Sequence, residues 1–409
     1  MFGNPVEIFS IVAAIILIGF AGDQFFRRTG VPSFLFLILA GIIIGPILGI
    51  FSPTMLLPAL GTISILTLTM VLFSGGIYIN IRALLRNGGR IFTQVILYVI
   101  LSMIIIAFFA HSVLGWDWTQ ALIFGSIVGG ETTAAVMVPL ARRLPLVEDV
   151  RVFLTVESAL NSILTVIFFI TFVGLYQSGG VSLSNAVSSI ASNLSIGIVI
   201  GLALSLIWIY LLNAIKKYKY TYVLTLGLLF LTYSVSSSLG GSGLLAVLIF
   251  GIVLGNHGFI GEIIHKVFKM STLEKRLAEF QEEISFLLET FFFVFLGLIF
   301  SIALSSLLFG LIIGSAIVII LLASRAFATT ISTFRSRLAY NKKTIFLLCA
   351  QGLTPATLAI LALSYNIPLA NTFVELVTYI IIITNIVTTV GSYLAFNSNK
   401  PKMANGASA

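Results

Sequence analysis

The amino-acid sequence predicts an all-α polytopic membrane protein with about thirteen transmembrane helices. Of its 409 residues, 59% are hydrophobic and only 9% are charged, whereas soluble domains carry roughly 25% charged residues. So few charges cannot cover a water-exposed surface, so lipid must be the solvent for most of the chain. A regular alternation of basic and non-basic loops is the third observation.

Apolar runs and helix-breaking residues divide the chain into spans of the length that a membrane requires, which is about 20 residues. The predicted spans are 6–26, 33–51, 56–79, 91–114, 118–141, 152–176, 187–213, 221–238, 242–260, 285–304, 308–331, 343–364 and 371–396. Residues 397–409 are then expected to form a short cytoplasmic tail.

The Lys and Arg residues lie almost entirely in loops that follow odd-numbered spans. Of the 22 basic residues, 21 lie in these loops or in the tail, and the exception is Arg325. The positive-inside rule then places the N-terminus outside and the C-terminus in the cytoplasm of a cell (inner) membrane protein. The alternation would fail if one span were wrong, and basic residues scattered in short loops argue against a nucleic-acid partner.

Two segments of the chain resemble each other. The sixteen residues from Gly30 match those from Gly240, which aligns Gly41 with Gly251. A weaker likeness aligns Leu72–Gly76 with the segment that ends at Gly297. The matched spans cross in opposite directions, which predicts an inverted repeat of spans 1–6 and 8–13. The repeats cover about 6–176 and 221–396, joined by the linker span 187–213, within a single transmembrane domain, 1–396. The alternative is two ordinary small-residue packing faces.

Inverted repeats are typical of secondary transporters, whose substrate sites lie near the bilayer centre at discontinuous helices in matching positions. The fifth span is interrupted by Gly129, Gly130, Glu131, Thr132 and Thr133, and the twelfth by Gln351, Gly352, Leu353, Thr354 and Pro355. Glycines loosen the first break, and a proline cannot donate to the helix ladder in the second. We expect the two broken spans to cross in a core domain.

Three charged residues lie deep in the predicted spans: Glu131 in the first break, Glu157 near the start of the sixth span, and Arg325. An unpaired charge at the bilayer centre costs at least ~2.5–3.5 kcal/mol. A structural ion pair between Arg325 and Glu157 would leave Glu131 unpaired. Burial favours the neutral carboxyl and a cation favours the charged one, so a proton and a metal ion would compete for Glu131. The alternative is a permanently protonated Glu131 that donates to the broken backbone.

Catalytic and metal-binding patterns are absent from the sequence. The three histidines have no metal-ligand spacing, and the lone Cys349 excludes a disulfide framework. There is no nucleophile with a base and an orienting partner. We therefore expect neither an enzyme, nor a cofactor, nor a resident metal, apart from a transient Na⁺ or K⁺.

The run from Ile127 to Val136, followed by Glu157-Ser158-Ala159-Leu160-Asn161-Ser162, resembles the NhaP/NHE-type monovalent cation/proton antiporters, the sodium/hydrogen exchanger family. In that family an Asp-Pro helix break is followed by Glu-Ser-x-x-Asn-Asp. The segments 72–76, 285–290 and 324–325 are also similar to family segments. The resemblance implies thirteen helices, a homodimer in the lipid bilayer, a mobile six-helix core with an elevator-like movement, and a Glu157–Arg325 pair.

The chain departs from the family pattern at four positions. Ser162 stands where the family has aspartate, Glu131 replaces the break aspartate, and Ser74 replaces a frequent acid. Thr354 stands where the family has arginine, so one charge of each sign is lost. Carried over, the proton and cation site comprises Ser74, Gly130, Glu131, Thr132, Ser158, Asn161 and Ser162.

These features predict a secondary antiporter that exchanges a monovalent cation, Na⁺ or else K⁺ or Li⁺, for H⁺ by elevator-type alternating access. One charge exchanged for another at Glu131 predicts electroneutral exchange. The alternative is an uncoupled cation pathway, or a transporter of a different substrate on the same fold, motivated by Ser162. A third interpretation is a sensor or scaffold that does not transport.

Overall fold

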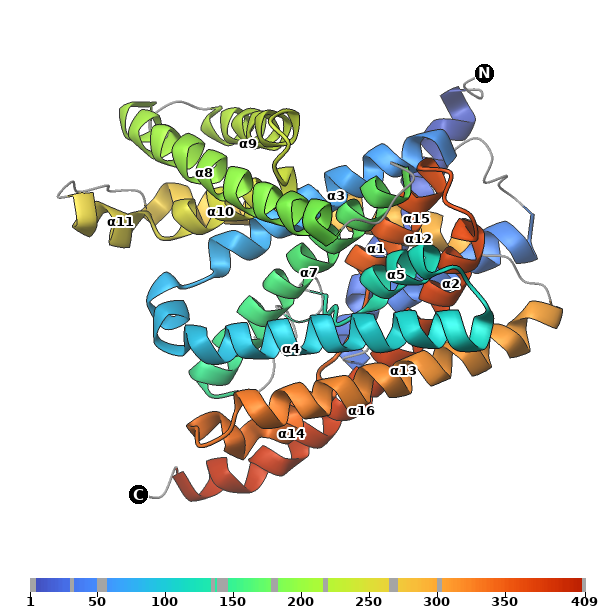
Figure 1. Ribbon diagram of the computed structural model, residues 1–409. Coiled ribbons are helices and arrows are strands. Elements are labelled where there is room, and N and C mark those ends of the chain that lie inside the picture. Colours follow the sequence, from blue (N-terminus) through green and yellow to red (C-terminus); the bar gives the residue numbers. More distant parts are fainter. Residues whose placement is uncertain are drawn as a thin grey trace.

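The computed structural model describes residues 5–29, 33–49, 57–133, 137, 146–177, 183–215, 220–264, 271–299 and 304–406. Within these ranges the regular structure is helical, with no strand (Figure 1). Six of the described helices are long and apolar enough to cross a membrane, and six shorter ones are also apolar. The predicted all-α membrane class is therefore confirmed.

The N-terminal half contains α1 (Pro5–Thr29), α2 (Ser33–Ile42) with the π-helical turn η1 (Ile43–Ile47), α3 (Leu57–Tyr78), α4 (Ile81–Leu114), α5 (Trp118–Val128) and α7 (Glu148–Gln177). The long helix α8 (Leu183–Ile215) follows. The C-terminal half contains α9 (Thr221–Ser238), α10 (Gly243–Gly255), α11 (His257–Ile264), α12 (Ser271–Leu298), α13 (Leu304–Ser332), the 3-10 helix η3 (Arg337–Asn341), α14 (Lys342–Leu347), α15 (Leu353–Ser364) and α16 (Ala370–Gly406).

Several helices extend beyond the apolar spans predicted from the sequence. The charged segments before 91 and before 285 were predicted as loops, but they are the first turns of α4 and α12. Likewise α16 continues to Gly406, through most of the predicted tail. Hydropathy marks only the part of a helix within hydrocarbon, and Lys, Arg and Glu are good helix formers in water.

The predicted span 242–260 is two helices, because α10 ends at Gly255 and α11 begins at His257. Asn256 separates them and fixes the connection between α3 and α4. Its Nδ2 donates to the Ile79 carbonyl at 2.7 Å, and its Oδ1 accepts from the Ile81 N–H at 3.0 Å. The side chain thereby satisfies backbone groups that leave the helical ladder.

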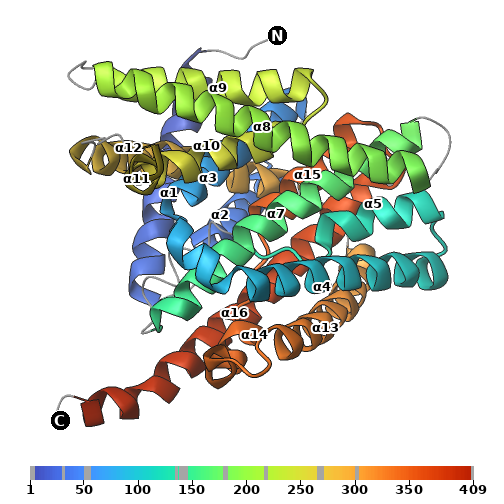
Figure 2. The same cartoon turned by 60° about the vertical axis from the view of Figure 1, so that its left-hand side comes forward.

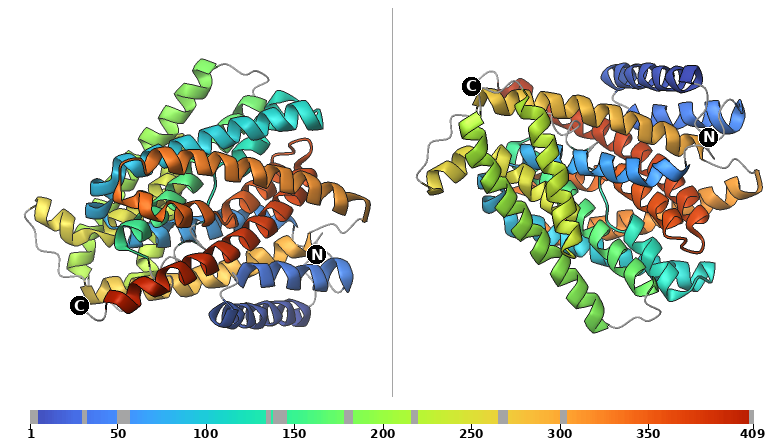
Figure 3. Two further views of the ribbon diagram at one scale, coloured as in Figure 1. Left: turned by 90° about the horizontal axis from the view of Figure 1, so that it is seen from below. Right: turned by 90° about the horizontal axis from the view of Figure 1, so that it is seen from above.

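The helices form two packed groups. The scaffold group contains α1, α2, α3, α8, α9, α10 and α12, and the core group contains α4, α5, α7, α13, α14, α15 and α16. Figure 2 shows α8 and α9 at one side of the molecule, and α13, α14 and α16 at the opposite side. In the views of Figure 3, α1 and α8 lie on opposite margins.

Glycine pairs bring four scaffold helices into close contact. Gly41 on α2 faces Gly297 on α12, and a Cβ at either glycine would overlap backbone of the other helix. In the same way Gly76 on α3 faces Gly251 on α10, with a Cβ at Gly76 only 2.6 Å from the Leu248 carbonyl oxygen. Since lipid supplies no hydrophobic drive between helices, such close backbone packing stabilises the bundle.

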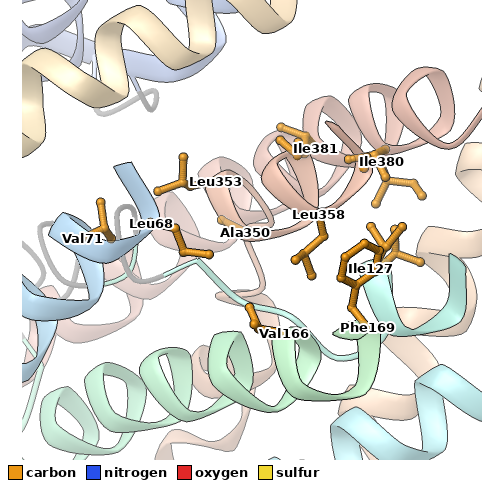
Figure 4. Packing of buried hydrophobic residues seen from close by; sticks show 14 of the residues in the cluster. Leu68, Val71, Ile127, Val166, Phe169, Ala350, Leu353, Leu358, Ile380 and Ile381 are labelled. Atoms are coloured by element: carbon orange, nitrogen blue, oxygen red, sulfur yellow. The ribbon is translucent and has the colours of Figure 1, made fainter. Parts of the chain in front are cut away.

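The core group meets the scaffold group through apolar side chains beside the break between α14 and α15. Leu68 and Val71 on α3 lie next to Ala350 and Leu353 (Figure 4). All four are at most 7% exposed. Apolar contacts of this kind are non-directional, and they hold the segment between α14 and α15 in the protein interior.

Candidate functional site

Two segments without helical structure lie against each other in the core group. Helix α5 ends at Val128 and is followed by 129–133, while 348–352 separates α14 from α15. The Thr133 N–H donates to the Ala350 carbonyl at 2.8 Å, and Gln351 Nε2 donates to the Val128 carbonyl at 2.6 Å. Buried backbone groups freed from the helices therefore bond to the other segment.

The second non-helical segment ends before the predicted proline. Thr354 and Pro355 were predicted as part of the break, and both lie in the first turn of α15, which begins at Leu353. The first N–H groups of a helix have no partner within the helix, so a proline there removes no hydrogen bond. The segment is instead formed by Leu348 to Gly352, which include the predicted residues Gln351 and Gly352.

Gly130 allows the first segment to turn against α4. Its φ is +71°, in the left-handed region, and a Cβ at this position would overlap the Cα of Val99. An L-residue would meet strain from its own backbone and from α4 together. The turn places the next residue, Glu131, in the interior.

We predict that Gly130→Ala destabilises the folded protein by about 1–3 kcal/mol, because it adds backbone strain and an overlap with α4. Gly174→Ala is the control, since a Cβ there meets nothing within 4 Å and alanine favours helix. Thermal unfolding in detergent should give opposite signs for the two variants. Equal midpoints would contradict the prediction.

Glu131 is fully buried, at 0% exposure. Its Oε1 accepts from the Ser162 hydroxyl at 3.2 Å, while its Oε2 has no hydrogen-bond partner among the described residues. The Thr354 hydroxyl and the Gly352 N–H also lie near the carboxylate. Gly352 is the N-cap of α15, and the N-terminal end of a helix carries partial positive charge. The carboxylate therefore lies at the N-terminal end of α15, which favours an anion.

Ser162 on α7 lies between three polar groups. Its Oγ is 3.1 Å from the Ser158 carbonyl and accepts from the Thr354 hydroxyl at 3.1 Å. A hydroxyl has one proton, so Ser162 donates either to Glu131 or to the Ser158 carbonyl. When Glu131 binds a proton or a cation, the Ser162 hydroxyl can rotate its proton from Glu131 to the Ser158 carbonyl, with no movement of the backbone.

The structure brings most of the predicted proton and cation ligands together. Asn161 Nδ2 donates to the Thr132 hydroxyl at 3.0 Å, and Asn161 Oδ1 is buried without a partner in the described parts of the chain. Ser158 directs its own hydroxyl to the Thr155 carbonyl at 2.9 Å. Ser74 is half-buried on α3, outside the hydrogen-bond network that these ranges give Glu131.

Glu157 and Arg325 form a bidentate ion pair in the interior of the core group. Arg325 Nη1 is 2.7 Å from Glu157 Oε1, and Nη2 is 3.1 Å from Oε2. Both residues are 0% exposed. Arg325 also donates to the carbonyls of Ile345 and Leu348 at 2.9 Å. It therefore satisfies the C-terminal end of α14 while it neutralises Glu157.

Gln94, which was not among the predicted site residues, extends this pair to α13. Its Nε2 lies 3.2 Å from both Glu157 Oε1 and Thr329 Oγ1, and its Oε1 accepts from Ser332 at 2.9 Å. Tyr98 places its ring 5.1 Å from the Arg325 guanidinium. A glutamine within an apolar span is the signal that could have identified it.

Three further residues that were not predicted as part of the site lie on α16 and hold the second segment. Asn385 Nδ2 donates to the Gln351 carbonyl at 2.7 Å, and the Thr384 hydroxyl accepts from the Gln351 N–H at 3.2 Å. Thr388 accepts from the Cys349 N–H at 3.1 Å. The non-helical backbone is thus fixed at both sides, by α5 and by α16.

Known proteins share this sequence pattern and fold. A family model described as the transmembrane sodium/hydrogen exchanger matches residues 11–395. The Na⁺/H⁺ antiporter 1 of Methanocaldococcus jannaschii is 25% identical over 346 residues, which cover 82% of this chain and 78% of that protein. The K⁺/H⁺ antiporter NhaP2 of Shewanella oneidensis is 32% identical over 142 residues, covering 34% of this chain and only 25% of that protein.

Among solved structures, the sodium proton antiporter MjNhaP1 from Methanocaldococcus jannaschii at pH 8 superimposes with a TM-score of 0.80 at 22% identity. The match covers 95% of this chain and 98% of that one. This likeness establishes the fold. Together with the match of the family model over nearly the whole length, it shows that this multi-pass membrane protein belongs to the sodium/hydrogen exchanger family of transporters.

Proposed function

We propose that this protein is a secondary antiporter that exchanges a monovalent cation, Na⁺ or else K⁺ or Li⁺, for H⁺. The observation that carries the proposal is Glu131, a fully buried carboxylate with one unpartnered oxygen among the described residues, at the junction of two non-helical segments. A desolvated carboxylate is stabilised either by a proton or by a cation. The proton and the cation cannot bind to Glu131 at the same time, and this competition couples the flux of one to the flux of the other.

The pairing of the buried charged residues supports this assignment. Arg325 is occupied by Glu157 and by the carbonyls of Ile345 and Leu348, so it does not neutralise Glu131. One proton or one monovalent cation neutralises Glu131, with oxygens of Asn161, Ser162 and the broken backbone as further ligands. We propose electroneutral exchange on this basis.

We also propose an inverted repeat of about thirteen transmembrane helices, in which two discontinuous helices, α5 with the following residues and α14 with α15, cross. The glycine contacts support it. The repeat aligns Gly41 with Gly251 and Gly76 with Gly297, so the α2–α12 contact and the α3–α10 contact are images of each other.

Transport would proceed by elevator-type movement of the core group against the scaffold group, in a homodimer embedded in a cell (inner) membrane. The contact between α3 and α15 supports such sliding because the side chains that meet there, among them Leu68, Val71 and Leu353, are apolar. The N-terminus would face outside and the C-terminus the cytoplasm, as the basic residues indicate.

The test is a proteoliposome assay with an imposed pH gradient, in which Li⁺, Na⁺ and K⁺ are added in turn with the membrane potential clamped or free. An antiporter gives cation-dependent proton movement, and electroneutral exchange gives rates that do not depend on the potential. Cation flux without proton movement would instead identify the alternative, an uncoupled pathway, and the absence of any flux would reject transport.

The alternative rests on Ser162, which lacks the carboxylate of the resembled family. Its hydrogen bond with Thr354, at 3.1 Å, shows that the position where that family has arginine lies directly beside it. A neutral pair thus occupies the place of a charged pair. These two positions together keep the net charge of the pair that they replace, which supports the antiporter over the alternative.

We predict that Ser162→Asp alone lowers the free energy of unfolding by about 1–3 kcal/mol in cation-free buffer, because it adds a second carboxylate beside Glu131 without a partner. The double variant S162D/T354R should recover most of the loss, since the two side chains are in contact. Thermal unfolding in detergent, with and without cation, measures both. Equal stability of the single and double variants would contradict the prediction.

A further inference from the structure

We infer that the Gln351 side-chain oxygen is a ligand of the dehydrated cation, contributed to the site by the second non-helical segment. The inference deepens the proposed antiport function and rests on it. It assigns to Gln351 a share in ion selectivity, in addition to its place in the broken helix. The ligand is a monovalent cation stripped of water.

The hydrogen bonds of Gln351 fix the direction of its amide group. Its backbone N–H and carbonyl are held by Thr384 and Asn385 on α16. Its side chain spans to the Val128 carbonyl at 2.6 Å. A carbonyl only accepts, so the amide must present its nitrogen to Val128. The oxygen then lies on the other branch, and a rotation of the amide would break the bond to Val128.

This oxygen has no donor among the described residues, and Gln351 is 0% exposed. A buried acceptor without a partner is rare in proteins, and coordination of an ion is one arrangement that satisfies it. Several other buried side-chain oxygens share this condition across the described residues, and two of them belong to the predicted site: Oε2 of Glu131 and Oδ1 of Asn161.

Gln351 is connected to the surroundings of Glu131 in two ways, through the next residue of its backbone and through the partner of its side chain. At one end, the next residue is Gly352, whose N–H lies near the Glu131 carboxylate. At the other end, Val128 begins the turn through Gly129 and Gly130 that reaches Glu131. Glu131 and Gln351 belong to the two non-helical segments, and Asn161 on α7 is bonded to Thr132 of the first one. Their unpartnered oxygens within the described ranges, one from a carboxylate and two from neutral amides, are of the type that a hard monovalent cation takes as ligands.

The experiment compares Gln351→Met, Gln351→Glu and Thr388→Val in proteoliposomes, with the apparent KM for Li⁺, Na⁺ and K⁺ measured for each at one pH. Gln351→Met keeps the length of the side chain but removes its oxygen. It should raise the KM of the preferred cation by about tenfold, as for loss of one polar ligand, and change the order or spacing of the three KM values. Thr388→Val, which removes support from Cys349 in the same segment, should lower the maximal rate but keep the KM ratios.

Gln351→Glu keeps an oxygen and loses the N–H donor, so it distinguishes a ligand from a brace. A ligand role predicts an unchanged or lower KM for this variant, and a bracing role predicts the same rise as in Gln351→Met. The inference would be overturned by the same rise in KM in Gln351→Glu as in Gln351→Met, or by unaltered KM values and ratios in Gln351→Met. In either case, exchange by the wild type would leave the proposed function standing. If Gln351→Met does not fold, Gln351→Glu alone decides. Absence of exchange in the wild type would instead remove the proposed function itself.

Discussion

Proteoliposomes that contain Glu131→Gln should show no cation-driven proton movement above the level of protein-free vesicles. The variant keeps the volume of the side chain but binds neither a proton nor a cation through a negative charge. The other deeply buried carboxylate, Glu157, cannot compensate, since it is paired with Arg325 at 2.7 Å. The loss should be complete because the competition between the proton and the cation depends on this one charge.

Glu148→Gln is the matched control, because Glu148 is an exposed carboxylate that pairs with Arg151 within one turn of α7. Exposed pairs contribute little to stability, so this variant should exchange like the wild type. Glu131→Asp retains the acid and should retain exchange with an altered KM. Full exchange by Glu131→Gln would reject the assignment, and cation flux without proton movement in that variant would favour the uncoupled alternative.

The sequence predicted the class of fold and the family because both leave local patterns in the chain, namely long apolar runs and a short motif of polar residues within them. Hydropathy alone revealed the apolar spans, and the run around Glu131 with Glu157–Ser162 predicted the family that the comparisons confirm. The helix ends were less predictable. In α4, α12 and α16 the helix continues past the apolar part, where the ladder of hydrogen bonds persists although the solvent changes.

The candidate site was predictable at the level of types of residue, and its bonding was not. Buried acids and glycines in apolar spans indicated where the chain is broken. The choice of partner for each freed carbonyl depends on which helices pack together, so Gln94, Thr384 and Asn385 could not be assigned to Glu157 or Gln351 beforehand. The break around Pro355 was placed too late because a proline fits the start of a helix as well as its interruption.

Glu157→Gln should lower the free energy of unfolding by about 3–5 kcal/mol, because it leaves the Arg325 guanidinium buried without a counter-charge. Both side chains are 0% exposed, so water cannot take the place of the lost carboxylate. The amide can still accept one hydrogen bond, which keeps the effect near the lower end of the range. Thermal unfolding of purified protein in detergent, at fixed pH and cation concentration, measures the change. The exposed pair is again the reference, and Glu148→Gln should shift stability by about 0–1 kcal/mol.

A double-mutant cycle with Glu157→Met and Arg325→Met separates the ion pair from the second role of the arginine. If Arg325 served only to neutralise Glu157, the double variant would approach wild-type stability, as buried ion pairs often tolerate apolar replacement. Arg325 also donates to the Ile345 and Leu348 carbonyls at the end of α14, and each unsatisfied acceptor costs about 1–3 kcal/mol. The double variant should therefore be more stable than Glu157→Met alone, yet remain below the wild type by at least about 1 kcal/mol. Wild-type stability in the double variant would show that the α14 carbonyls need no donor, and a purely additive cycle would show that the two charges are not coupled.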